Sequence, residues 1–180
     1  MKNVLLLTTA AIFGIAFLAP QANAQQFSTS TKLDVKAKID NTCVFSTTSA
    51  LAFPAYAPIG KNKQEDLDAS STVAVRCTAG LGGVALQINA GTTADASCTG
   101  DISRSLRRGG NSTTDLLTYE LYQDAERTLP WGCDETTQKS LETFSDSTVD
   151  VVHTLYGRVP AGQFAQPGSY SDTIQYKIIF

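Results

Sequence analysis

The sequence predicts an all-β protein, a sandwich of two sheets, and three observations carry that prediction. Short stretches alternate apolar and polar side chains, which is the period of a strand with one buried face. Clusters of Gly, Pro, Asn, Asp and Ser separate these stretches and are typical of turns. No stretch of about 12 residues, the length of an ordinary helix, shows a helical period. Short strands in a chain of this length favour a sandwich.

Residues 1–24 are predicted to be a cleaved signal peptide. Lys2 gives a positive start, residues 4–18 are almost wholly apolar, and Ala22 and Ala24 are small residues where signal peptidase cleaves. A membrane anchor is the alternative, but the apolar run has about 15 residues where a spanning helix needs roughly 20. We therefore expect an exported chain that begins near Gln25 and has no stable membrane insertion.

Residues 25–40, QQFSTSTKLDVKAKID, alternate as a half-buried strand does. One face is apolar to neutral and carries Phe27, Thr29, Thr31, Leu33, Val35, Ala37 and Ile39. The other face is polar throughout. From the residues alone, an ordinary first strand of the chain's own domain is the favoured interpretation. Chain termini fray unless something holds them, so the partner of this strand is an open question.

The body of the chain contains further strands of the same kind. Residues 71–77, 83–90, 116–122 and 150–159 are predicted strands. Their inward faces are expected to carry Val73, Val75, Cys77, Val84, Leu86, Ile88, Leu117, Tyr119 and Leu121.

The last residues, YSDTIQYKIIF, are predicted to form one terminal strand without a hairpin partner. Its apolar face carries Tyr170, Ile174, Tyr176, Ile178 and Phe180. An uncovered apolar edge invites pairing with another chain. The spare strand at the start of one molecule could therefore complete the sheet of the next. Such a contact joins different surfaces and extends as a filament.

Composition and motifs disfavour several classes of function. The formal net charge of −3 argues against a nucleic-acid partner. The cluster Arg104, Arg107 and Arg108 is expected to be a solvated strand edge. His153, the single histidine, lies within a predicted strand and is expected to be structural, which disfavours a Ser-His-Asp triad. The carboxylates of 64–68 and 133–135 are expected in solvated loops, so neither an enzyme nor a cofactor is predicted.

Four cysteines in an exported chain indicate two disulfides. Cys43, Cys77, Cys98 and Cys133 allow three pairings, and their spacing does not choose among them. The gaps between them are too long for the short Cys-x-x-Cys pairs of a zinc site.

Several motifs together carry a resemblance to a known family. They are NTCVF at 41–45, LAFPAY at 51–56, VAVRC at 73–77, LTYELYQDAERTLPWG at 117–132 and YGRVPAGQFAQPGSYSDTIQYKI at 156–178. In these motifs the chain resembles the spore coat protein U domain family, which includes subunits of archaic chaperone–usher pili. The resemblance covers the whole mature chain in the family's order. Pro54 replaces a common Gly and is expected to change only a local turn.

The resemblance implies an incomplete immunoglobulin-like sandwich over residues 41–180 that lacks its last strand. In such pilins a periplasmic chaperone lends a strand, and the N-terminal extension of a neighbouring subunit later replaces it, a case of β-augmentation. The implied donor strand is the extension 25–40, with Phe27, Leu33, Val35, Ala37 and Ile39 facing the neighbour. Residues 170–180 would border the acceptor groove. The resemblance also implies the disulfides Cys43–Cys77 and Cys98–Cys133.

The implied function is that of a structural pilus subunit in a homo- or hetero-polymer. Its expected partners are a periplasmic chaperone, an outer-membrane usher and neighbouring pilin subunits. Its expected location is the periplasm and then the cell surface, with roles in adhesion and biofilm formation. Nothing matches an extra lectin-like domain, which favours a shaft subunit over a two-domain tip adhesin. The alternative is a secreted coat-like or adhesive module that self-associates without a chaperone and usher.

Overall fold

The computed structural model describes residues 25–93 and 96–180, so the predicted signal peptide lies outside the described residues. The chain divides into a unit that ends at Ala37 and a second unit, Lys38–Phe180. The second unit contains all the described strands, and one turn of 3-10 helix is the helical structure among the described residues. None of the helical structure in the described ranges has the length and apolarity to cross a bilayer.

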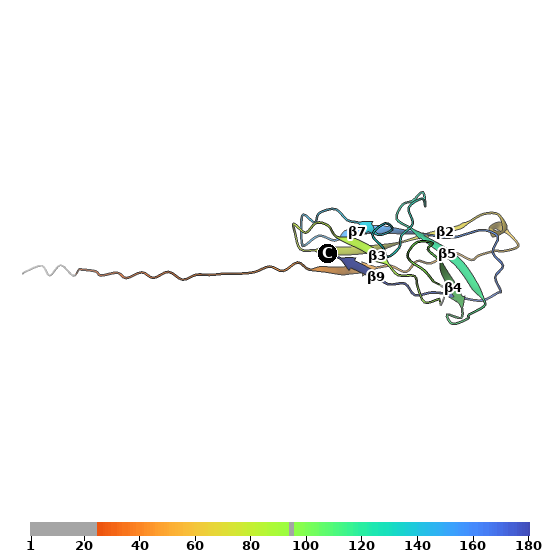
Figure 1. The fold of residues 1–180 in the computed structure, drawn as a ribbon, viewed down its shortest axis with the longest axis horizontal. Coiled ribbons are helices and arrows are strands. Elements are labelled where there is room, and N and C mark those ends of the chain that lie inside the picture. Colours follow the sequence, from red (N-terminus) through yellow and green to blue (C-terminus); the bar gives the residue numbers. More distant parts are fainter. Residues whose placement is uncertain (1–24, 94–95) are drawn as a thin grey trace, which may run out of the picture. The chain divides into compact units, whose positions relative to one another are not determined.

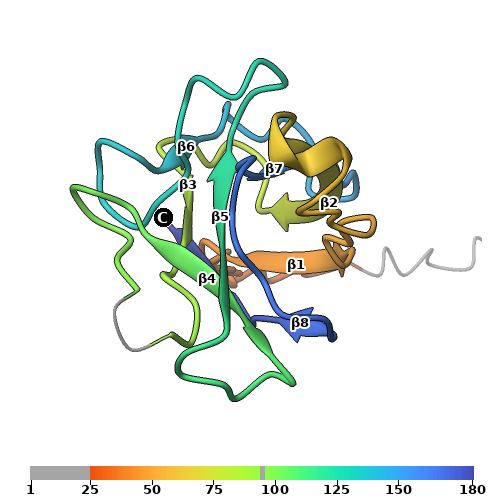
Figure 2. The same cartoon turned by 90° about the vertical axis from the view of Figure 1, so that its right-hand side faces the viewer.

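The described strands pair antiparallel in two sheets, as expected for the predicted all-β class (Figures 1 and 2). The larger sheet has the order β1-β2-β7-β5-β4-β8, and the smaller has the order β6-β3-β9. The elements are β1 (Cys43–Thr48), η1 (Lys61–Lys63), β2 (Leu67–Cys77), β3 (Ala85–Ile88), β4 (Arg104–Arg108), β5 (Leu116–Tyr122), β6 (Lys139–Ser140), β7 (Val151–Val159), β8 (Tyr170–Ser171) and β9 (Tyr176–Ile179).

The core lies between the sheets and contains the side chains that alternation predicted. The buried residues shared by the prediction and the structure are Val73, Val75, Cys77, Val84, Leu86, Ile88, Leu117, Tyr119 and Leu121. Trp131, the one tryptophan of the sequence, is also fully buried, and its indole Nε1 donates to the carbonyl oxygen of Leu86 at 2.9 Å. This contact joins the loop after β5 to β3.

Arg104 corrects one expectation from the sequence, because it is buried and not on a solvated edge. Its Nε donates to the carbonyl oxygen of Asn89 at 3.0 Å, and its Nη2 donates to that of Trp131 at 2.9 Å. These carbonyls belong to backbone that leaves β3 and β5, where no ladder satisfies them. A buried carbonyl without a donor is costly, so the guanidinium replaces a missing strand partner. Arg108 keeps the predicted exposed position and pairs with Asp115.

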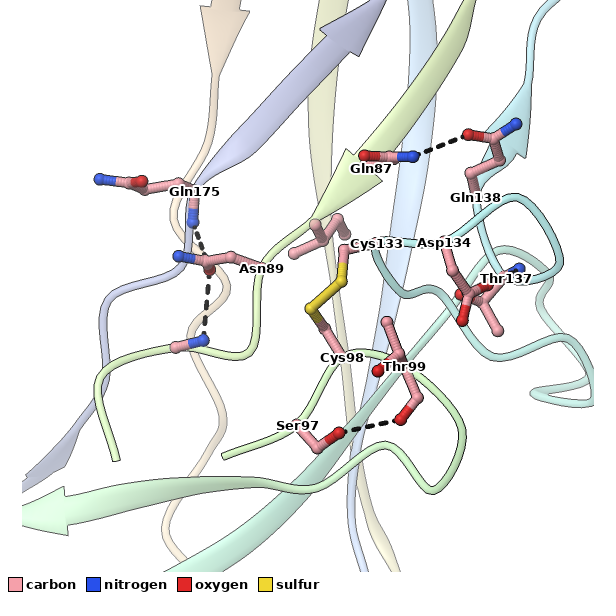
Figure 3. The surroundings of a disulfide bond; sticks show 12 residues. Gln87, Asn89, Ser97, Cys98, Thr99, Cys133, Asp134, Thr137, Gln138 and Gln175 are labelled. Carbon is pink, nitrogen blue, oxygen red and sulfur yellow. Dashed lines mark hydrogen bonds between the residues drawn. A yellow bond between two sulfur atoms is a disulfide. The ribbon is translucent and has the colours of Figure 1, made fainter. Parts of the chain in front are cut away.

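Two disulfides fasten the fold with the pairing that the family resemblance implies. Cys43 bonds to Cys77 between β1 and β2, which are also directly opposite in the ladder. Cys98 bonds to Cys133 and joins the loop before β4 to the loop after β5 (Figure 3). Beside it, Thr137 and Thr136 donate hydrogen bonds to Asp134 and lower the pKa of that carboxyl to about 2.

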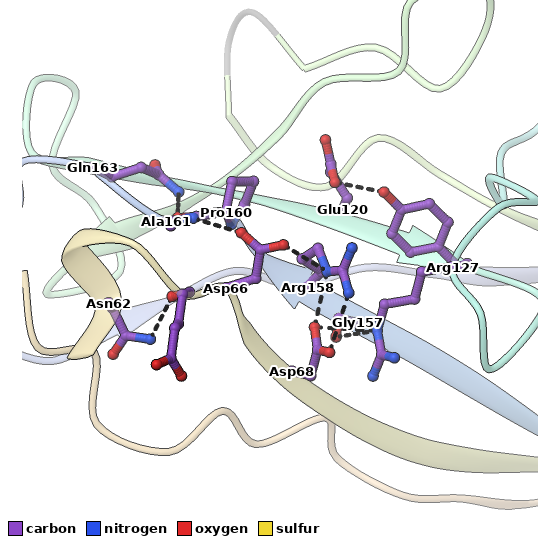
Figure 4. A network of polar contacts seen from close by, with 12 residues as sticks. Asn62, Asp66, Asp68, Glu120, Arg127, Gly157, Arg158, Pro160, Ala161 and Gln163 are labelled. Atoms are coloured by element: carbon purple, nitrogen blue, oxygen red, sulfur yellow. Dashed lines mark hydrogen bonds and ion pairs between the residues drawn. The ribbon is translucent and has the colours of Figure 1, made fainter.

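Asp68 differs from the solvated loop predicted for 64–68 because it lies in a strand, whereas Asp66 keeps the predicted exposed position outside the strands. Asp68 lies in β2 and forms ion pairs with Arg158 of β7 at 3.0 Å and with Arg127 at 3.2 Å (Figure 4). Asp66 pairs with Arg158 at 3.3 Å. The hydrogen bond from Arg158 lowers the pKa of Asp68. These contacts hold the loop around Arg127 against the outer face of the larger sheet.

Residues 170–180 do not form the single terminal strand that was predicted. They form β8, which pairs with β4 in the larger sheet, and β9, which pairs with β3 in the smaller sheet. The break lies at Asp172, whose Oδ1 accepts hydrogen bonds from the backbone N and the Oγ1 of Thr92 at 2.9 and 2.6 Å. The same oxygen accepts from the backbone N of Thr173 at 2.8 Å, and a local bond of this kind favours a turn over a continuous ladder.

Candidate functional site

The most distinctive feature of the fold is a gap between two edge strands. β1 ends the larger sheet and β9 ends the smaller one, and within the described residues no backbone ladder joins them. The rings of Phe45 on β1 and Tyr176 on β9 lie 6.0 Å apart, between centroids, across this gap. Both strands therefore present free N–H and C=O groups along one line of the molecule, which is the usual requirement for adding a strand.

A cavity of about 620 Å³ opens beside this gap. Residues from the stretch after β1 form one wall, residues 172–176 form the other, and the core forms the floor. The lining is mostly apolar and includes Phe45, Leu51, Phe53, Leu155, Ile174 and Tyr176.

A second cavity of about 530 Å³ continues the first, because both are lined by Phe53 and Leu106. Its walls are residues 53–58 and 165–170, and its floor includes Leu67, Leu117 and Val159. We call the two cavities together the edge groove. Its long, apolar form between strand edges suits an extended peptide better than a compact small molecule.

The wall formed by residues 51–58 is held in place by close packing on β7. Gly157 allows this approach, since a Cβ at that position would lie 2.6 Å from Leu51 Cδ2 and 2.8 Å from Phe53 Cζ. Farther along, the Tyr56 hydroxyl donates to the carbonyl of Pro160 at 3.1 Å and accepts from the backbone N of Gln163 at 2.9 Å. The LAFPAY motif therefore forms a side of the groove.

The opposite wall is held by Asp172, whose Oδ2 accepts a hydrogen bond from the Tyr119 hydroxyl at 2.7 Å. Burial, reinforced by this bond, raises the pKa of Tyr119, which therefore stays neutral. Burial works against the charge of Asp172, but the hydrogen bonds from Thr92 and Tyr119 outweigh it and lower the pKa of the carboxyl. An ionised Asp172 thus fixes the turn that leads into β9.

Ser71 and Tyr176 both line the first cavity of the groove. Ser71 on β2 is buried, with 6% of its surface exposed. Tyr176 lines the same cavity, and burial raises its pKa to about 12 although the nearby Ser71 lowers it.

The predicted donor residues lie outside every described strand. Residues 25–42 have no regular secondary structure, and each residue from 25 to 42 is exposed. The exposed fractions are 88% for Phe27, 84% for Leu33, 85% for Val35 and 84% for Ile39, and Ala37 is exposed as well. The apolar face of this segment is therefore not packed against the described part of the chain.

The predicted groove residues divide between the edge groove and other positions. Tyr170, Ile174 and Tyr176 line the groove. Ile178 packs against the core, and Phe180 is 57% exposed. The sequence prediction missed the opposite wall, formed by Phe45, Leu51 and Phe53, and the polar pair of Tyr119 and Asp172. The alternation of Leu51 and Phe53 in LAFPAY was an available signal for that wall.

His153 lies in β7 as expected, and its ring Nε2 is buried without a hydrogen-bond partner among the described residues. Burial, with a contribution from Lys139, lowers its pKa. Over the described ranges, no cluster of His, Cys, Asp or Glu could hold a metal ion.

A known protein family matches the part of the chain that contains these motifs. The Spore Coat Protein U domain matches residues 29–177. The chain belongs to the Spore Coat Protein U domain family. The matched range of this Spore Coat Protein U domain includes most of the exposed segment 25–40, both walls of the edge groove and all four cysteines. The resemblance inferred from the sequence motifs is thereby confirmed.

Two known proteins are similar to this chain over most of its length. Protein U from Myxococcus xanthus is 29% identical over 184 residues, which cover 99% of each chain. A solved structure with TM-score 0.52 and 15% identity is the CsuC–CsuE chaperone–tip adhesion subunit pre-assembly complex from archaic chaperone–usher Csu pili of Acinetobacter baumannii. The match covers 79% of this chain but only 40% of that one. The likeness supports the predicted all-β, immunoglobulin-like fold.

Proposed function

We propose that the chain is a structural subunit of a surface pilus that polymerises by donating its N-terminal strand to a neighbour. The observation that carries the proposal is the edge groove, an apolar gap between the unpaired edges of β1 and β9. The exposed alternating segment 25–40 of another copy has the backbone hydrogen-bonding groups and the apolar side chains that would fill this groove.

The backbone explains why a strand is the expected occupant. β1 and β9 each pair on one side only, so an inserted strand gains hydrogen bonds to both edges. An inserted strand would join the two sheets and cover the core side chains that line the floor. The domain 41–180 is therefore an incomplete sandwich that a donor strand from another chain completes.

The side chains set the register of the inserted strand. Side chains of a strand alternate between its faces, so Leu33, Val35 and Ile39 all point into the groove or all point away from it. With these apolar side chains inward, together with Phe27 and Ala37, the polar face from Ser28 to Asp40 remains in water. A shift by one residue would bury Lys36 and Lys38, which is strongly unfavourable.

A periplasmic chaperone and an outer-membrane usher are the partners that we propose for assembly. An apolar groove exposed before polymerisation is an aggregation hazard, and a chaperone strand would cover it until the neighbour's segment arrives. The disulfides Cys43–Cys77 and Cys98–Cys133 are of the kind that forms in an oxidising compartment such as the periplasm. Residues 1–24 would direct that export, and adhesion and biofilm formation would follow from a surface fibre.

A coat-like module that self-associates without a chaperone and usher is the second candidate. The observation that favours it is the 29% identity with Protein U over nearly the full length of both chains. Both candidates use the same groove and the same segment. Recovery of the subunit in a one-to-one complex with a chaperone from periplasmic extracts supports the pilus, and recovery of self-associated subunit without a chaperone supports the coat-like module.

Removal of the segment tests the proposal. We expect deletion of residues 25–36 to leave an exported, disulfide-bonded subunit that no longer forms fibres visible by electron microscopy. A matched control carries the residues of 25–36 in a scrambled order that keeps composition and length but destroys the alternation, and it should fail equally. A Leu33→Val variant keeps the alternation and should assemble. Normal polymerisation of the deleted or scrambled chain would contradict strand donation.

A further inference from the structure

Among residues 38–180, two groups of large exposed apolar side chains lie at opposite ends of that unit, and Leu129 belongs to neither group. One end, which we call the near end, contains the start of β1 and the end of β9, and the far end contains η1 (Figure 1). Ile59 and Phe164 at the far end are 98% and 100% exposed. At the near end the exposed fractions are 53% for Val149, 60% for Val152 and 57% for Phe180. Apolar side chains exposed to this degree mark a contact surface.

The far-end pair is continuous with the edge groove. A cavity of about 290 Å³ is lined by Ile59, Phe164 and Leu116, and it shares Pro58 and Tyr170 with the second cavity of the groove. The groove therefore opens at the far end between two fully exposed apolar side chains. A strand that leaves the groove there would pass beside the cavity that these two side chains line.

Asp40, the last residue of the segment 25–40, is hydrogen-bonded to Thr78. Thr78 Oγ1 donates to the carbonyl oxygen of Asp40 at 3.2 Å, and the backbone N of Thr42 donates to that Oγ1 at 3.0 Å. Asp40 is thus fastened to the near end, and Ile39 directly precedes it. When Ile39 occupies a neighbour's groove, the donating body must lie against the mouth of that groove.

The symmetry of the contact between two copies determines at which end the donated strand leaves the groove. If the strand left the groove at the near end, the near ends of two copies would meet, and two copies could exchange strands and close into a dimer. If it leaves at the far end, near end meets far end, and the contact repeats without closing. This geometry also makes the donated strand antiparallel to β9, which ends at the near end (Figure 1).

We propose that Ile59 and Phe164 form a docking patch for the near end of the donating copy, so that subunit bodies contact each other at the groove mouth. The inference rests on the proposed strand donation. The near-end valines Val149 and Val152, with Phe180, are the complementary apolar surface. The patch makes the fibre a chain of packed bodies, and loss of the patch alone leaves strand exchange possible but loosens each junction.

Site-specific photo-crosslinking tests the docking patch in assembled fibres of the full chain. Benzoylphenylalanine in place of Phe164 should give covalent adducts between subunits, and mass spectrometry should map them to residues 38–44, 146–152 or 180 of the neighbour. The same group in place of Leu129 is the control, because Leu129 is 56% exposed and lines none of the three cavities. Adducts at 129 should be absent or severalfold weaker.

The outcomes of the crosslinking test strand donation and the docking patch separately. Normal fibres with no adduct at 164, or with adducts between two far ends, would overturn the docking patch and leave strand donation standing. Closed dimers in place of fibres would overturn the head-to-tail junction. Absence of fibres from the unsubstituted chain would overturn the proposed function and the patch together. As a second readout, the Ile59→Ser, Phe164→Ser double variant should still polymerise, and its fibres should fragment more readily under shear than those of Leu129→Ser.

Discussion

The hydroxyl of Tyr119 donates a 2.7 Å hydrogen bond to Asp172, and this bond fastens the wall of the edge groove to the floor. Tyr119 belongs to β5 in the larger sheet, and Asp172 begins the turn that carries the chain to β9 in the smaller sheet. The position of β9, and so the width of the gap that a donor strand must fill, depends on this contact.

The lowered pKa of Asp172 predicts a loss of stability in acid. A carboxyl with a folded pKa below its unfolded value of about 3.9 stabilises fully above that value, and its contribution is lost as the pH falls through the folded pKa. Asp172→Asn should therefore lower stability at pH 7 and weaken the dependence on pH below about 4. Urea unfolding of assembled material, followed by Trp131 fluorescence, measures both. Glu126→Gln, at an exposed loop position, is the control and should match the unsubstituted protein.

Replacement of the buried Arg104 is expected to lower the stability of the fold strongly. Arg104→Ala should destabilise the fold by roughly 2–5 kcal/mol, because the carbonyls of Asn89 and Trp131 would lose their donors. Arg104→Lys should recover little, since one ammonium cannot reproduce the planar fork that reaches both carbonyls. Arg108→Ala, which removes an exposed pair with Asp115, serves as the matched control and should change stability by less than about 1 kcal/mol. An Arg104→Ala protein as stable as this control would contradict the assigned role.

A side chain at Gly157 is expected to disturb the groove wall and not the core. Gly157→Ala should displace Leu51 and Phe53, lower the free energy of unfolding by about 1–3 kcal/mol and reduce fibre yield. Gly83→Ala is a useful comparison, because an added Cβ there meets nothing within 4 Å but the backbone is left-handed, with φ of 72°. It should lower stability by backbone strain while fibre yield per folded subunit stays normal. Equal fibre yield per folded subunit for both variants would show that the wall does not shape the groove.

The strands themselves were predictable because burial of one face imposes a period of two on the sequence. Val73 and Val75, or Leu117 and Leu121, follow that period and are buried as expected. The exposed segment with Leu33 and Val35 carries the same period, so alternation alone could not separate a strand of its own sheet from one without a partner among the described residues.

The remaining features depend on contacts between distant residues. Arg104 reads as a surface cation in sequence, and only the fold brings the carbonyl of Trp131, 27 residues away, to its guanidinium. Asp172 interrupts an apolar alternation because Thr92, 80 residues earlier, binds its carboxylate. The wall at Leu51 depends on the absence of a side chain at Gly157. The alternation of apolar and polar residues indicates which face of a strand is buried, but it does not indicate which distant residues come into contact.

The register of the donated strand is the central claim, and Val35→Asp against Lys36→Asp tests it most directly. Val35 would face the neighbour's groove and Lys36 would face water, so a carboxylate at 35 meets a severe desolvation penalty and one at 36 does not. The measurement is fibre yield from cells, with the melting temperature of each chaperone-bound subunit as the control for folding. The account predicts that Val35→Asp abolishes fibres, that Lys36→Asp leaves them nearly intact, and that both subunits melt normally. Equal loss of fibres from the two variants, or a collapsed melting temperature for Val35→Asp, would contradict the account.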